Sequence, residues 1–87
     1  MERFVETCIS NHPELNKVCF INITDGHIGY DIEIECKNNV VAGLYPTDTW
    51  EMKSILSLCD SLTEELLKRE IKVIEDREEW ELLKTQS

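Results

Sequence analysis

The stretch that decides the fold is KVCFINITDGHIGYDIEIEC, residues 17–36. Residues 17–24 are rich in β-branched and aromatic side chains, which favour strands. Residues 27–36 alternate apolar and polar side chains, as expected for a strand with one face on a core. Asp25-Gly26 stands between them and is a strong signal for a two-residue hairpin turn. The stretch therefore predicts an antiparallel β-hairpin.

The register of this hairpin follows from pairing the strands outward from the turn. Ile21 then lies opposite Tyr30, and the apolar partners all fall on one face. A slip of one residue would destroy that agreement. On the other face, Phe20 lies opposite Asp31, so we expect that face to mix acids with exposed apolar side chains. This is the composition of a protein-binding patch with a polar rim.

The rest of the sequence predicts one α+β domain over residues 1–87. An N-terminal helix, a three-stranded antiparallel sheet made of two hairpins, a long helix, a short strand and a short C-terminal helix follow one another. The first helix is expected at 2–11, and the three strands are expected at 17–24, 27–36 and 40–45, with a turn at Lys37-Asn38-Asn39. The long helix begins at the Asp48-x-x-Glu51 capping box, and a short strand follows at 71–74. The C-terminal helix begins at the Asp76-x-x-Glu79 cap.

Three local alternatives stay open in this scheme. The core face of the third strand is either Val40, Ala42 and Leu44 or the opposite set, because the loop length is not fixed. Residues 71–74 are β-branched, which favours a strand, yet the apolar stripe of the long helix could also run on through them. Ser61-x-x-Glu64 could restart that helix after a bend.

Composition excludes several classes of function. The chain has 87 residues, 18 acidic and 9 basic, and a net charge of -9. A negative charge repels the phosphates of nucleic acids, so we expect no direct nucleic-acid binding. No stretch approaches the roughly 18 to 20 apolar residues of a membrane span. The length suits one domain, which we expect to act through its surface.

The cysteines and histidines offer little chemistry. No Cys-x-x-Cys pair and no apolar signal segment occur, so we expect reduced, buried thiols in a cytoplasmic protein. Cys8 and His12 are four residues apart on the first helix, but Pro13 pulls His12 off helical geometry. We expect no metal, no cofactor and no enzymatic activity. The cysteines are Cys8, Cys19, Cys36 and Cys59.

Acidic residues form two clusters. One lies on a single face of the second strand, with successive carboxylates about 6.5 to 7 Å apart. The other surrounds Trp80 near the C-terminus and would suit a basic partner. Solubility and helix-dipole effects are the simpler explanation of each cluster. The candidate partner-binding residues are Phe20, Asp31, Glu33, Glu35, Glu75, Asp76, Glu78, Glu79, Trp80 and Glu81.

In length, acidity and element order, the chain resembles small phage-encoded anti-CRISPR proteins. Some of these inhibit Cas9 by covering its basic DNA-binding surface with carboxylates. The resemblance implies a non-enzymatic inhibitor that mimics the charge of DNA and blocks a Cas effector in the host cytoplasm. No family motif is matched, so it carries over no site residue.

Other functional classes share these gross features. A small acidic immunity protein that neutralises a nuclease toxin is one alternative, and a self-associating interaction module is another. Double-stranded RNA-binding domains have a similar element order, but their basic helix start is replaced here by Asp48-Thr49-Trp50-Glu51. We expect a basic protein partner, such as a Cas nuclease or effector complex, and a monomer or weak dimer without membrane contact.

Overall fold

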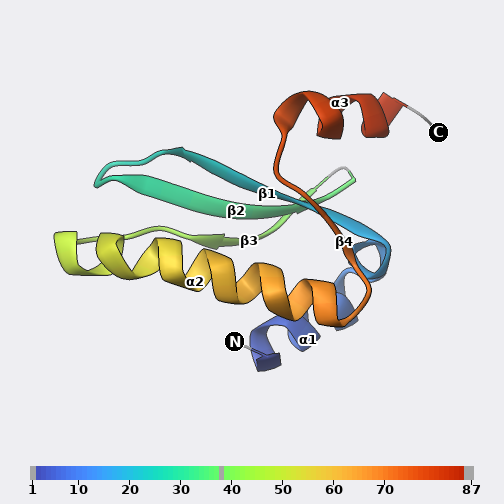
Figure 1. Cartoon of the computed structure of the whole chain (residues 1–87), viewed down its shortest axis with the longest axis horizontal. Coiled ribbons are helices and arrows are strands. Elements are labelled where there is room, and N and C mark those ends of the chain that lie inside the picture. Colours follow the sequence, from blue (N-terminus) through green and yellow to red (C-terminus); the bar gives the residue numbers. More distant parts are fainter. Residues whose placement is uncertain (1, 38, 86–87) are drawn as a thin grey trace.

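The computed structural model describes residues 2–37 and 39–85, without the side chains of residues 49–53 (Figure 1). It confirms the α+β class. Residue 38 of the expected second turn and the side chain of the expected capping residue Glu51 lie outside this description. The elements are α1 (Glu2–Asn11), a 3-10 helix η1 (Pro13–Asn16), β1 (Val18–Asp25), β2 (Tyr30–Cys36), β3 (Asn39–Leu44), α2 (Thr49–Lys68), β4 (Lys72–Ile74) and α3 (Arg77–Thr85).

The strands form one mixed sheet with the order β3-β2-β1-β4. β1, β2 and β3 run antiparallel, whereas β4 pairs parallel to β1. Figure 1 shows α1 and α2 on one side of the sheet and α3 on the other. The sheet is thus partly covered on both faces.

The hairpin forms, but its expected register is wrong. Ile21 pairs with Ile34, and Tyr30 pairs with Asp25 at the end of the hairpin. The turn spans residues 26–29; the Gly26 N–H donates to the Gly29 carbonyl at 2.8 Å, and Gly29 has a φ of 77°. A wider turn closed by this left-handed glycine moves each β1 partner four positions along β2. Because four is even, every side chain keeps its face.

β3 follows neither of the two expected core faces along its whole length. Ala42 pairs with Ile34 and, like Leu44, packs against the main core. A register shift between Ile34 and Glu35 lets Val41 also pack against the core, while Val40 is exposed. The irregularity is a bulge-like feature, which places two neighbouring residues on nearly one side of a strand.

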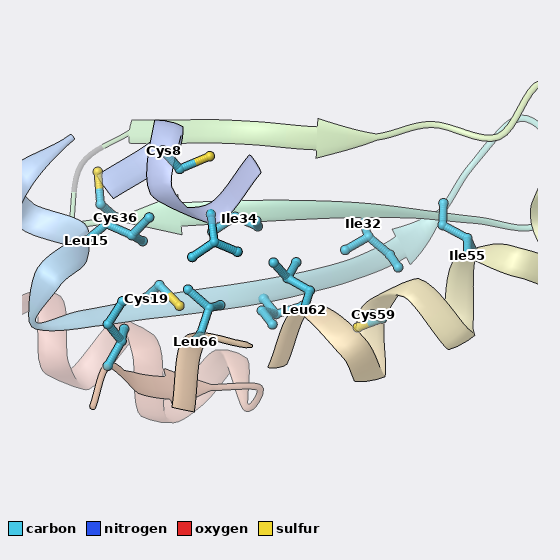
Figure 2. Packing of buried hydrophobic residues seen from close by; sticks show 13 residues of the cluster. Cys8, Leu15, Cys19, Ile32, Ile34, Cys36, Ile55, Cys59, Leu62 and Leu66 are labelled. Carbon is cyan, nitrogen blue, oxygen red and sulfur yellow. The ribbon is translucent and has the colours of Figure 1, made fainter. Parts of the chain in front are cut away.

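The main core lies between the inner face of the sheet and helices α1 and α2 (Figure 2). The expected burial of the cysteines is confirmed, and all of them are free thiols. Burial, together with the nearby Cys36, raises the pKa of Cys19 to about 12. The buried members of this core are Val5, Cys8, Leu15, Cys19, Ile21, Ile32, Ile34, Cys36, Ile55, Cys59, Leu62, Leu66 and Ile71.

A second, smaller core lies on the opposite face of the sheet. Phe20 and Trp80 are 1% and 0% exposed, and together with Ile74 they form this cluster. Their rings stack with centroids 5.5 Å apart and an interplanar angle of 12°. The expectation that Phe20 and Trp80 are exposed is therefore wrong, because α3 folds over the outer face of β1.

The end of α2 decides the state of residues 71–74. The Ile71 N–H donates to the Leu66 carbonyl at 3.1 Å, and the Glu70 N–H donates to the Leu67 carbonyl at 3.0 Å. This is the Schellman pattern, in which the residue after the helix cap is left-handed. Glu70 takes that position with a φ of 61°. The helix is unbroken from Thr49 to this cap, without a restart at Ser61, and the chain then leaves as strand β4.

Replacing Glu70 by glycine should stabilise the protein. A non-glycine residue in the left-handed region costs about 1 kcal/mol, and glycine removes that cost. We expect Glu70→Gly to raise the free energy of unfolding by about 0.5 to 1 kcal/mol in urea denaturation. The matched control Glu64→Gly, inside α2, should lower it by a similar amount. Loss of stability in Glu70→Gly would contradict the cap.

Removing the Trp80 ring should expose the outer face of β1. Trp80→Ala should lower the free energy of unfolding by about 3 to 5 kcal/mol, because a large buried ring is lost. The control Leu82→Ala, at an exposed position of the same helix, should change it by less than about 0.5 kcal/mol. Equal effects of the two substitutions in urea denaturation would show that α3 does not pack as described.

The Trp80 indole N–H is buried without a hydrogen-bond partner among the described residues. A buried unpaired donor costs about 1 to 3 kcal/mol. Trp80→Phe removes this donor and keeps an aromatic ring against Phe20. It should therefore cost much less stability than Trp80→Ala in the same assay.

Candidate functional site

The outer face of β2 carries the first acidic cluster, as expected from its alternation. Asp31, Glu33 and Glu35 are all half-buried and alternate with the buried Ile32 and Ile34. The three carboxylates differ in what surrounds them. These surroundings decide which of them can meet a partner.

Glu35 is tied to α3 by an ion pair. Its carboxylate lies 3.8 Å from the guanidinium of Arg77, and its side chain is only 14% exposed. The same guanidinium lies over the Phe20 ring, 4.7 Å from its centroid, and 3.3 Å from the carboxylate of Glu81. Arg77 therefore links the two acidic clusters and partly neutralises Glu35. This link cannot be deduced from either cluster alone.

Glu33 accepts a hydrogen bond from the Tyr45 hydroxyl at 2.8 Å. Tyr45 follows β3 and folds back across Gly43, where the ring occupies the space that a Cβ would need. Glycine at 43 thus allows the ring to reach the neighbouring strand. The bond to the Glu33 carboxylate is the main reason that the pKa of Tyr45 is raised. Tyr45 was not among the residues expected at this site.

Asp31 has no ion pair and no hydrogen bond to its side chain among the described residues. It lies against Gly26, whose missing side chain makes room for its carboxylate. Asp25, at the end of β1, is exposed. The hairpin over residues 18–36 contains no Lys or Arg. Uncompensated negative charge is therefore concentrated at the end of the hairpin that α3 does not cover.

The second acidic cluster is mostly involved in local contacts. The Asp76 carboxylate accepts the backbone N–H of Glu78 at 3.1 Å and so caps α3. Glu79 lies 3.9 Å from Lys72, and Glu81 lies 3.7 Å from Lys84. Helix electrostatics and local pairing account for much of this cluster, as the simpler explanation proposed.

Two carboxylates of the second cluster can still contact a binding partner. Glu75 and Glu78 are exposed, and none of the ion pairs among the described residues involves their carboxylates. Trp80, expected to be a binding hot spot between the acids, is instead fully buried between α3 and the outer face of β1. Any contact made by this cluster would therefore be ionic rather than aromatic.

The thiols are placed for packing rather than for reaction. Burial raises the pKa of the Cys8 thiol, which disfavours the reactive thiolate. His12 contacts the same turn through its backbone, donating its N–H to the Cys8 carbonyl at 2.9 Å. Among the described side chains of residues 2–37, 39–48 and 54–85, no three metal-ligating groups come together. In the same part of the chain, no helix has the length and apolarity to cross a bilayer.

A groove between β1 and α2 was not expected from the sequence. It is lined by Ile21, Ile23, Leu56, Cys59 and Asp60 together with neighbouring residues, and its volume is about 510 Å³. One feature of the sequence points to such a groove: the predicted strand at 17–24 is longer than the one at 71–74. A short strand leaves part of a longer neighbour unpaired.

The Tyr45–Glu33 bond predicts a measurable titration. In a Tyr30→Phe background, which leaves Tyr45 as the only tyrosine, Tyr45 should ionise above the ordinary pKa of about 10. The bond stabilises the fold below that ordinary pKa, and this contribution is lost as the pH rises through the raised value. Glu33→Gln should lower the Tyr45 pKa, which is measured by the ultraviolet absorbance of the phenolate as the pH rises. An unchanged pKa would contradict the bond, and Glu14→Gln serves as the control.

The structure thus offers two surfaces, the acidic hairpin end and the groove beside β1. The first was expected at Asp31 and Glu33, and the second comes from the topology of the sheet. No family model, no curated protein and no solved structure matches the chain.

Proposed function

We propose that the protein is a non-enzymatic inhibitor that binds a basic, nucleic-acid-handling protein through the acidic end of its hairpin. In this proposal it is an anti-CRISPR protein whose carboxylates take the place of DNA phosphates on a Cas effector. The charge of -9 would speed association with a basic surface and make it depend on salt.

One observation carries the proposal: the hairpin holds acids and no Lys or Arg. Asp31 and Glu33 lie on one face of β2, two residues apart, which separates their carboxylates by about 7 Å. Phosphates along a DNA strand repeat at a comparable distance. Asp25 extends the same charge to the tip of the hairpin.

The contacts within the protein narrow the surface that we propose for the partner. Glu35 is held by Arg77, and Phe20 is covered by α3. Asp31 and Glu33 are therefore the principal contacts. Glu75 and Glu78 are secondary ones, because their charges are exposed and outside the ion pairs described above.

Charge reversal tests the proposal. The probe is a purified Cas9 loaded with guide RNA, and the readout is its cleavage of duplex DNA with increasing amounts of the protein. Asp31→Lys/Glu33→Lys should weaken inhibition about a hundredfold or more, because both attractive contacts become repulsive. Glu14→Lys/Glu64→Lys makes the same change in net charge at two exposed positions elsewhere and should weaken inhibition much less.

The outcomes separate the charge mimic from its alternatives. Equal loss in the two double variants would mean that net charge alone acts, which contradicts a hairpin site. No inhibition of Cas9, with inhibition of a purified nuclease toxin domain instead, would favour an immunity protein and overturn the anti-CRISPR assignment. Thermal unfolding of each variant shows whether it is folded before these comparisons are made.

A further inference from the structure

Strand β4 covers only part of the edge of β1. Its three residues pair with residues 18–20 of β1, and the chain then turns away into α3. β1 itself runs on to Asp25. Figure 1 shows β4 crossing β1 near one end, with the rest of β1 extending beyond it. No described strand pairs with this side of residues 21–25.

The backbone of this open segment points its polar groups outward at alternate residues. On the β2 side, the ladder ends with the Gly26 N–H donating to the Gly29 carbonyl. On the β4 side, the Lys17 carbonyl accepts the Lys72 N–H at 3.2 Å. Even-numbered residues of β1 therefore face β2 and odd-numbered ones face β4. Beyond β4, Ile23 and Asp25 are left with N–H and C=O groups directed to the open edge.

The groove runs along this same edge. The side chain of Ile23 is 45% exposed and that of Leu56, on the facing helix α2, is 50% exposed. Both line the groove, with Asp60 and Glu75 among its polar residues and Arg77 as its basic one. A strand laid beside β1 would place alternate side chains against these apolar groups. Edge hydrogen bonds and an apolar groove thus coincide.

This edge lacks the features that usually block strand pairing. Residues 21–25 contain no Pro and no Lys, and the described register of β1 with β2 is regular. Asp25 alone supplies a charge, at the far end. An open edge of this kind is a template for an added strand.

We propose that the edge of β1 over residues 21–25 binds an extended, basic peptide segment of a partner protein as a fifth strand. The segment would hydrogen-bond to the backbone of Ile23 and Asp25 and place an apolar side chain in the groove. A lysine or arginine would meet Asp60 and Glu75. This site lies apart from Asp31 and Glu33, although Asp25 and Glu75 border both surfaces, and it does not depend on the proposed function.

Charge decides the occupant. A basic segment is attracted by the carboxylates of Asp25, Asp60 and Glu75. The groove contains one opposing positive charge, the guanidinium of Arg77. A second copy of the chain could pair edge to edge, but each copy has a charge of -9 and brings Asp25 to the interface. Like charges at such a contact are destabilising. We therefore assign the edge to a basic peptide rather than to self-association.

The test uses a blocked heptapeptide in which lysine and valine alternate. Amide hydrogen exchange is followed by NMR with and without saturating peptide. The N–H groups of Ile23 and Asp25 should exchange at least about tenfold more slowly with peptide, because they become hydrogen-bonded. The same peptide with N-methyl groups on alternate residues, on the side that faces β1, should protect neither.

Two variants locate the contact. Ile23→Pro removes the edge N–H and is tolerated where that group faces no strand, so peptide binding should be lost while the amide spectrum stays folded. Asp60→Lys should weaken binding about tenfold, whereas its neighbour Glu64→Lys, outside the groove, should have little effect. If Ile23→Pro fails to fold, Asp60→Lys and the methylated peptide still decide the question.

Two results would overturn the proposal. One is the absence of protection at Ile23 and Asp25 with peptide present. The other is protection without peptide that grows with protein concentration, which would assign the edge to a second copy. Neither result bears on cleavage inhibition by Asp31 and Glu33, so the two proposals can fail separately.

Discussion

The burial of β1 on both faces is the constraint on which the rest of the structure depends. Cys19 and Ile21 point into the main core, and Phe20 between them points to the other side. Helices on one face cannot cover all three side chains. The outer face therefore needs its own helix, and α3 supplies it through Trp80. The placement of β4, of the Arg77 ion pairs and of the second acidic cluster follows from this requirement.

The periodicity of apolar residues and the helix-capping residues predict most of the elements. They do not predict the pairing register of the first hairpin. The alternation of β2 has a period of two, so a shift by four positions leaves the pattern of faces unchanged. Only the turn distinguishes the registers, and Gly29 competes with Asp25-Gly26 for it. By contrast, the run of apolar residues 18–21 breaks the alternation, which is typical of a strand covered on both faces. That run favours the burial of Phe20, against the exposure that we expected from the hairpin register alone.

The candidate site was partly predictable for the same reason. The alternation of β2 is enough to place Asp31, Glu33 and Glu35 on one face. Their different surroundings depend on Arg77 and Tyr45, which come from separate elements. Pairing between side chains that are distant in sequence is set by tertiary packing, which no local pattern records. The groove beside β1 depends in turn on the lengths of two strands far apart in the chain.

The small second core also links the number of exposed carboxylates on the acidic face to whether α3 stays docked on the sheet. α3 is held to the sheet by one aromatic stack, a few aliphatic contacts and the ion pairs of Arg77, so it can detach by breaking these contacts while the main core stays intact. When α3 detaches, Arg77 leaves with it, and Glu35 joins the uncompensated carboxylates while Phe20 becomes accessible. The acidic face is thus smaller in the ground state than in the opened state. A partner that uses Phe20 and Glu35 must therefore offset the free energy of opening α3 with its own contacts to these residues.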